Sequence, residues 1–172
     1  MAADEVDPLR KFREMFLMPK GTYFMGNSLG LCPRVAELAL SNFIVSQWGA
    51  NGIEGWNKCN WLSYPRMIGD KIGKLIGAED GETIVLESTS ASIFKCLTTS
   101  IAIQKIDNPH RSVIVLEREN FPTDNYVVEG LLTLMNQGYE IRYFDNGENP
   151  LEKTVGGDTV VVLLSLVNYR TG

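Results

Sequence analysis

Hydroxyl-bearing side chains gather where a helix is predicted to begin. The segment Glu87 to Ser92 has four hydroxyl residues in five positions, directly after a short apolar stretch. The first turn of a helix has backbone N–H groups without partners and a partial positive charge, so it can bind phosphate. The alternative interpretation is an ordinary Ser/Thr N-cap, which needs fewer hydroxyls than this segment provides. The pattern therefore favours an anion site.

A second group combines an aromatic ring with a carboxylate. Phe121, Pro122, Thr123 and Asp124 stand where a predicted strand passes into a predicted helix. An aromatic ring at such a turn can stack on a flat ligand ring, and a carboxylate can orient a substituent of that ring. The alternative is a hydrophobic staple with an N-cap.

Other motifs with possible chemistry fail on spacing or context. The Gly69–Lys74 stretch resembles a phosphate-binding loop, but it is one residue short, lacks the final Ser/Thr and falls inside a predicted helix. No G-x-G-x-x-G follows a predicted strand. His110 is the single histidine, and we expect it in a solvated loop. A zinc site of ordinary spacing and a Ser-His-Asp system are therefore both disfavoured.

Strands and helices alternate in the second half of the sequence. Apolar runs predict strands at 83–86, 112–117, 139–144 and 159–166, and helical patterns predict helices at 89–106 and 122–137, the latter with Gly138 just past its end. This order predicts an α/β fold with a mainly parallel sheet flanked by helices. Ligands of such sheets bind beyond the carboxyl ends of the strands, where 87–92, 118–124 and 165–172 should converge.

The first half is expected to lead into this domain. It predicts a short helix from Pro8 to about Phe16, helices that begin at Pro33 and Pro65, and a loop over 49–61. An apolar stripe on the last of these helices is predicted to be core. We expect 1–60 to form an N-terminal arm and helix, and 61–172 the first part of a large domain. That domain is expected to be incomplete, or truncated, because the sequence stops just after an apolar strand.

Composition limits the function classes. The 172 residues are 44% hydrophobic and 22% charged, with a net charge of −5, which disfavours binding to nucleic acid. The longest apolar run, 160–164, is too short to span a membrane, and the N-terminus lacks the apolar region of a signal peptide. The three cysteines, widely spaced, suit reduced thiols. These features predict a soluble, cytoplasmic protein.

Read in order, several segments resemble kynureninase. The matching segments are Tyr23–Leu31 with Pro33, Gly52–Trp56 with Trp61, Ile68–Lys71 with Ile76–Ala78, Ser88–Ser90 with Phe94–Lys95, Phe121–Asp124 with Tyr126, and Val167–Gly172. The family consists of fold-type-I enzymes that depend on pyridoxal 5'-phosphate (PLP). They hydrolyse L-kynurenine or 3-hydroxykynurenine to anthranilate or 3-hydroxyanthranilate and L-alanine, in tryptophan catabolism toward NAD biosynthesis.

The resemblance implies roles for individual residues. Thr89 and Ser90 would bind the cofactor phosphate, and Phe121 would stack on the pyridine ring. The remaining implied contacts, with the cofactor and then with the substrate, are Pro122, Thr123, Asp124 and Ser165, and Asn27, Ser28 and Trp56. The resemblance also implies a homodimer and an amino-acid substrate.

The family's catalytic residues have no counterpart in this sequence. The aspartate that faces the pyridine nitrogen, a neighbouring histidine and the Schiff-base lysine all follow the family's equivalent of 168–172. We therefore expect no catalytic residue in this chain, and no activity from the chain by itself. Two alternatives remain: another fold-type-I lyase similar to cysteine desulfurases, which usually stack a histidine on the ring, and a short inactive paralogue that acts as a binding module.

Overall fold

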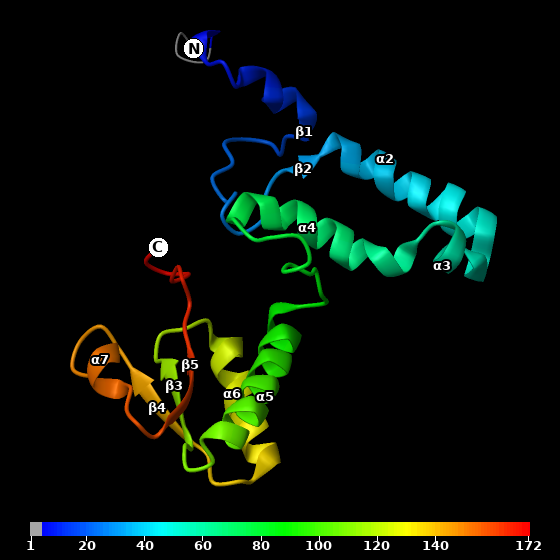
Figure 1. Cartoon of the computed structure of the whole chain (residues 1–172). Coiled ribbons are helices and arrows are strands. Elements are labelled where there is room, and N and C mark those ends of the chain that lie inside the picture. The colour runs from blue at the N-terminus through cyan, green and yellow to red at the C-terminus, as the bar shows by residue number, and fades with distance from the viewer. Residues whose placement is uncertain (1–4) are drawn as a thin grey trace. The chain divides into compact units, whose positions relative to one another are not determined.

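The computed structural model describes residues 5–172 and divides into two compact units, Met1–Val85 and Leu86–Gly172 (Figure 1). Each unit is described separately. Within the described residues, no helix is both long enough and apolar enough to cross a bilayer. The predicted boundary between an N-terminal arm (1–60) and a large domain (61–172) refers to the domain in the complete protein, and it stays a prediction.

The second unit is built on a parallel sheet of three strands. These are β3 (Val113–Glu117), β4 (Glu140–Phe144) and β5 (Thr159–Leu163), in the order β4-β3-β5. Two long helices, α5 (Thr89–Asp107) and α6 (Pro122–Met135), connect into and between the strands. Figure 1 shows both helices on one side of the sheet and the short helix α7 (Leu151–Thr154) toward the other. The predicted α/β class with a parallel sheet is confirmed.

The central strand explains why the unit folds around this sheet. Successive side chains of a strand point to opposite faces, so an apolar run fits a strand that is covered on both sides. In β3, Ile114 and Leu116 pack with α5 and α6 in the main core, whereas Val113 and Val115 pack with Phe144 on the other face. The apolar run predicted to be a strand is confirmed as β3. It is the central strand, and both of its faces are buried.

The ends of the two long helices follow local chemistry. The Ser88 side chain accepts a hydrogen bond from the Ala91 N–H at 3.2 Å, which confirms the predicted N-cap of α5. The glycine prediction at the end of α6 is wrong in detail. Asn136 adopts the left-handed conformation (φ 47°) directly after Met135, and Gly138 lies beyond it. Asn tolerates this conformation better than most residues do, so it ends the helix two residues earlier than predicted.

The predicted strand at 83–86 is wrong. The segment is without regular structure, although the Val85 N–H donates to the Pro65 carbonyl at 3.1 Å. A strand is defined by hydrogen bonds to a neighbouring strand, and 83–86 pairs with none of β3, β4 and β5. The β5 strand is also shorter than predicted and ends at Leu163 rather than at residue 166.

The first unit consists of short helices and one small strand pair. Its elements, in order, are a 3-10 helix (Arg10–Met15), β1 (Phe16–Leu17), β2 (Cys32–Pro33), α2 (Arg34–Asn42), a π-helical stretch (Phe43–Gly49), a 3-10 turn (Gly52–Glu54), α3 (Gly55–Lys58), a 3-10 turn (Trp61–Ser63) and α4 (Tyr64–Ile76). The predicted loop over 49–61 is therefore wrong, since it contains α3. The predicted first helix is a 3-10 helix instead.

The α4 helix packs through glycine and not through its apolar stripe. Gly69 and Gly73 are its buried residues, and they lie against Thr83 and Ile84. The stripe predicted to be core is exposed: Met67, Ile68, Ile72, Leu75 and Ile76 are all at least 42% exposed. Backbone approaches the helix at the glycine face because no side chain stands in the way. The helix ends at Gly77, which adopts the left-handed conformation (φ 79°).

Adding one methyl group should have opposite effects in two helices. At Gly69 a Cβ would lie 2.1 Å from the Thr83 carbonyl oxygen, whereas at Gly130 in α6 it would meet nothing within 4 Å. We expect Gly69→Ala to destabilise the first unit by about 1–3 kcal/mol. We expect Gly130→Ala to stabilise the second unit by about 0.5–1 kcal/mol.

Urea unfolding measures both effects. The three tryptophans, Trp48, Trp56 and Trp61, all lie in the first unit, so their fluorescence reports Gly69→Ala. Circular dichroism reports Gly130→Ala. Equal shifts of the two variants in the same direction would contradict the packing of α4.

An ion pair closes the connection between β4 and β5. The Arg142 guanidinium bonds to both oxygens of Asp158, at 3.2 and 2.7 Å, and to the Thr154 carbonyl at 3.0 Å. The hydrogen bond from Arg142 lowers the pKa of Asp158 below its usual value. A carboxyl group with a lowered native pKa stabilises the fold above its unfolded pKa, and this contribution disappears as the pH falls through the native pKa.

Asp158→Asn should therefore lower stability in a pH-dependent way. At pH 7 the variant should unfold at a lower urea concentration than the original chain, and the difference should shrink as the pH falls below 3.8, the ordinary value. Glu148→Gln, in the same connection and exposed, is the matched control and should leave the midpoint unchanged. A difference that stays constant down to pH 2 would rule out the ion pair as its source.

Candidate functional site

The carboxyl ends of β3 and β5 lie side by side, and the segments that follow them are joined by polar contacts. The Asn168 side chain donates to the Glu117 carboxylate at 3.3 Å and to the Glu119 carbonyl at 3.1 Å. The Asn168 side-chain oxygen Oδ1 accepts the Arg170 N–H at 2.9 Å, which shapes the turn after β5. The two segments therefore form one polar edge, as the α/β order predicts.

Asn120 makes the closest link between these segments. Its side-chain oxygen accepts the Phe121 N–H at 2.8 Å and the Ser165 hydroxyl at 2.5 Å. Asn120 is 5% exposed, so these bonds lie away from water. A buried polar group is held firmly when its partners are present, because leaving it unpaired costs about 1–3 kcal/mol. Asn120 thus fixes the backbone of Phe121 and the side chain of Ser165 at once.

Phe121 presents its ring at this edge. The side chain is 48% exposed, and the edge of the ring meets Tyr169 with centroids 5.1 Å apart at 73°. Pro122, Thr123 and Asp124 form the first turn of α6, where proline is well tolerated. Burial raises the pKa of the Asp124 carboxyl, and a hydrogen bond with Thr123 opposes that rise.

Thr89 and Ser90 form the first turn of α5. Within Leu86–Gly172 their backbone N–H groups and hydroxyls have no acceptor, because Ser88 caps the N–H of Ala91 instead. These free donors are the chemistry that a phosphate dianion requires. The donor set therefore fits a phosphate group.

The two helix starts lie at the same end of the second unit (Figure 1). α5 and α6 run in the same direction, and their buried residues Leu97 and Val128 share one core cluster. Leu97 is eight residues after Thr89 and Val128 six residues after Pro122, distances of about 12 Å and 9 Å along a helix. Both core residues thus stand about two turns from the start of their own helix. Figure 1 shows both starts at the end of the unit where the strands finish.

Charge near the α5 start is balanced locally. The Lys95 ammonium contacts the Glu87 carboxylate at 2.5 Å, and this hydrogen bond lowers the pKa of Glu87. A carboxylate beside an anion site would repel phosphate. Lys95 offsets that charge at the position just before the hydroxyl-rich turn.

A hollow of about 460 Å³ opens beside the α6 start. Asn120, Pro122 and Tyr169 line it, but Thr89 and Phe121 do not. Arg118 and Tyr143 form its wall. The Arg118 guanidinium lies 5.1 Å from the Tyr143 ring centre and 3.7 Å from the Asp145 carboxylate.

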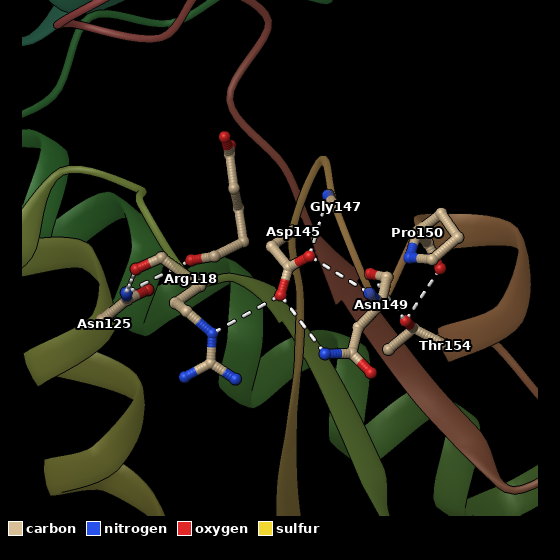
Figure 2. Close-up of polar contacts among 8 residues, drawn as sticks. Arg118, Asn125, Asp145, Gly147, Asn149, Pro150 and Thr154 are labelled. Atoms are coloured by element: carbon tan, nitrogen blue, oxygen red, sulfur yellow. Dashed lines mark hydrogen bonds and ion pairs between the residues drawn. The ribbon is translucent and has the colours of Figure 1, made fainter.

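Hydrogen bonds hold the residues next to this hollow, where Asp145 and Gly147 line a second hollow with Arg118 (Figure 2). Asp145 accepts the N–H groups of Gly147 and Asn149 at 2.9 and 3.1 Å, and these bonds lower its pKa. Asn125 holds the Glu117 and Arg118 carbonyls from α6, as Figure 2 shows for Arg118. Burial and the hydrogen bond that Tyr143 donates to Glu129 raise the pKa of Tyr143 to about 12, so this phenol stays protonated.

The predicted substrate residues lie in the first unit. The Ser28 N–H donates to the Met25 carbonyl at 3.0 Å, and Asn27 is exposed in the same turn. The Trp56 ring meets Trp61 edge-on with centroids 5.5 Å apart. With Phe43 they line an apolar hollow of about 520 Å³. A role for these residues toward the substrate stays a prediction.

Sequence reasoning missed Asn120 and the contact of Tyr169. Both stand beside recognised positions, since Asn120 precedes Phe121 and Tyr169 follows the last strand. The sequence signal for Asn120 was its place in the turn between a predicted strand and a predicted helix, where a polar residue becomes buried and needs hydrogen-bond partners. By contrast, His110 lies exposed in a turn, as predicted.

Fold and geometry together define the class of protein. A parallel sheet with its helix starts and loop residues converging at the carboxyl edge is the arrangement of open α/β proteins that bind ligands at that edge. The residues at the edge combine anion donors with an exposed aromatic ring.

Among proteins of this class, the chain is similar in sequence to kynureninases. The chain is 40% identical over 173 aligned positions, all of its length, to the kynureninases of Pseudomonas fluorescens and Burkholderia pseudomallei (strain K96243). The kynureninase of Burkholderia mallei (strain ATCC 23344) is 39% identical over the same extent. The chain spans 41% of the length of these relatives. No family model matches the chain.

The similarity confirms the predicted resemblance to kynureninase. It extends over the whole chain, and the homology implies the fold-type-I architecture that the sequence predicted. The α/β fold with its parallel sheet agrees with that class.

Proposed function

We propose that this chain is the front part of a PLP-dependent kynureninase, which hydrolyses L-kynurenine or 3-hydroxykynurenine to L-alanine and anthranilate or 3-hydroxyanthranilate. The observation that carries the proposal is the pairing of two helix starts at one sheet edge. One of them offers the free donors of Thr89 and Ser90, and the other offers the exposed ring of Phe121. Similarity to kynureninases over the whole chain supports the same conclusion.

Each residue has a defined task in this proposal. Thr89 and Ser90 bind the phosphate through N–H and hydroxyl donors, aided by the partial positive charge of the α5 start. Phe121 stacks on the pyridine ring, and Pro122, Thr123 and Asp124 complete that wall. Ser165, held by Asn120, contacts the cofactor from the segment after β5. When bound, PLP supplies the electron sink for carbanion chemistry next to the amino group.

The lysines of this site are not placed to carry the cofactor. Lys95 pairs with Glu87, and Lys153 lies on α7 between β4 and β5. We therefore propose that residues 1–172 alone do not turn over substrate, and that a lysine elsewhere in the complete protein completes the site.

The proposal also includes the setting of the enzyme. A homodimer is supported by the many exposed apolar side chains of the first unit, such as Leu38, Ile44 and Trp48, each at least 52% exposed. We propose a cytoplasmic enzyme of the kynurenine pathway with a small amino-acid substrate. A desulfurase-like lyase is less well supported, because position 121 is phenylalanine and not histidine.

An activity assay tests the proposed function. The complete gene product, saturated with PLP, should release fluorescent anthranilate from L-kynurenine, and removal of PLP should abolish the signal. The 172-residue chain should give none under the same conditions. Release of sulfur from cysteine without release of anthranilate would replace kynureninase with the desulfurase alternative.

A further inference from the structure

We infer that Asn120 is a positioning residue of the cofactor site. Its side-chain oxygen holds Phe121, which stacks on the cofactor ring, and Ser165, which contacts the cofactor from the other segment, in fixed positions relative to each other. This inference rests on the proposed function. Nothing in the similarity to kynureninases assigns a role to this position. It is argued from two hydrogen bonds, burial and the location of Asn120 between two segments.

One oxygen atom accepts hydrogen bonds from both Phe121 and Ser165. The Phe121 N–H and the Ser165 hydroxyl both donate to Asn120 Oδ1, at 2.8 and 2.5 Å. Phe121 and Ser165 are separated by 44 positions in the sequence and come from different strand ends. No other single atom at this edge joins both of these residues among the contacts of Leu86–Gly172.

The bond to the Phe121 N–H controls where the ring lies. Phe121 sits before α6 with φ −58° and ψ 128°, and its backbone N–H is outside the helical hydrogen-bond pattern. Without the Asn120 oxygen this N–H would lose its partner, and rotation about the backbone would move the ring. A ring that must lie flat against a ligand tolerates little displacement, because stacking depends on close contact over its face.

Asn168 provides a matched comparison within the same edge. It too joins the segments after β3 and β5, but through Glu117 and Glu119, and its side chain makes no hydrogen bond to Phe121 or Ser165. If joining the segments were all that mattered, loss of either asparagine would have the same effect on the cofactor. If the oxygen of Asn120 positions Phe121 and Ser165, only the loss of Asn120 should weaken binding of the cofactor.

The test measures PLP affinity and the visible circular dichroism of bound PLP in the complete protein. Asn120→Leu keeps the approximate shape but removes the acceptor, and it should weaken PLP binding roughly tenfold and change the dichroic band. Asn120→Asp keeps an acceptor oxygen and should retain affinity within about threefold. Asn168→Ala should leave affinity within about twofold.

The outcomes separate the inference from the proposed function. Unchanged affinity and dichroism in Asn120→Leu would overturn the inference, as would an equal loss in Asn168→Ala or in Asn120→Asp. A parent protein that binds no PLP would instead overturn the proposed function. If Asn120→Leu does not fold, Asn120→Ala removes the same acceptor with less bulk. It should also weaken PLP binding roughly tenfold, and unchanged binding would overturn the inference.

Discussion

Replacing both Thr89 and Ser90 with alanine should weaken PLP binding about a hundredfold. Each hydroxyl is free to donate to the phosphate, and a hydrogen bond to a charged group contributes about 1.5–3 kcal/mol. Two such bonds at the lower end of this range give about 3 kcal/mol, which is roughly a hundredfold in Kd. The backbone N–H groups remain in the variant, so binding should weaken without being abolished.

Pyridoxal without its phosphate is the control ligand. The double variant should bind pyridoxal as the parent protein does, because only the phosphate contacts are lost. Thr98→Ala, in the middle of α5, is the control variant, since its hydroxyl bonds to the Phe94 and Lys95 carbonyls. Equal losses for PLP and pyridoxal in the double variant would place the phosphate elsewhere.

Leu116→Ala should destabilise the second unit by about 2–5 kcal/mol. Leu116 is completely buried in the central strand and packs in the core formed with α5 and α6. Removing three carbons there leaves a cavity between the sheet and both helices, which relax only partly. Total stabilities are commonly about 5–15 kcal/mol, so the loss is a large fraction of the whole.

Urea unfolding followed by circular dichroism measures this loss. The control is Leu134→Ala in α6, the same substitution at a side chain that is 77% exposed. It should change the free energy of unfolding by no more than about 0.5 kcal/mol. Similar effects of the two variants would mean that the core does not lie between β3 and these helices.

The sequence predicted the second unit well because its signals are local or strongly periodic. The apolar run of β3, the hydroxyl cap at Ser88 and the turn at Phe121 each follow from neighbouring residues. Predictions failed where the outcome depends on distant partners. The segment 83–86 has strand composition, but no strand of the sheet pairs with it. The α4 stripe has core composition, but the glycine face is the one that packs.

The candidate site shows the same limit. Thr89, Ser90 and Phe121 could be chosen from residue type and position, since helix starts and strand-to-helix turns are visible in the sequence. The role of Asn120 could not, because its partner Ser165 lies 45 positions away and its burial depends on the packed sheet. Nor does a sequence pattern show where the starts of α5 and α6 lie relative to each other. That the two starts lie at the same end of the unit is visible only in the folded chain.

The most direct test of the cofactor site is a titration of the complete protein and its Phe121→Ala variant with PLP. The account predicts that loss of the ring weakens binding of both PLP and pyridoxal, by about 1–3 kcal/mol, because stacking acts on the ring and not on the phosphate. Unchanged affinity for both ligands in Phe121→Ala would show that the aromatic turn of α6 and the hydroxyl-rich start of α5 do not hold the same molecule.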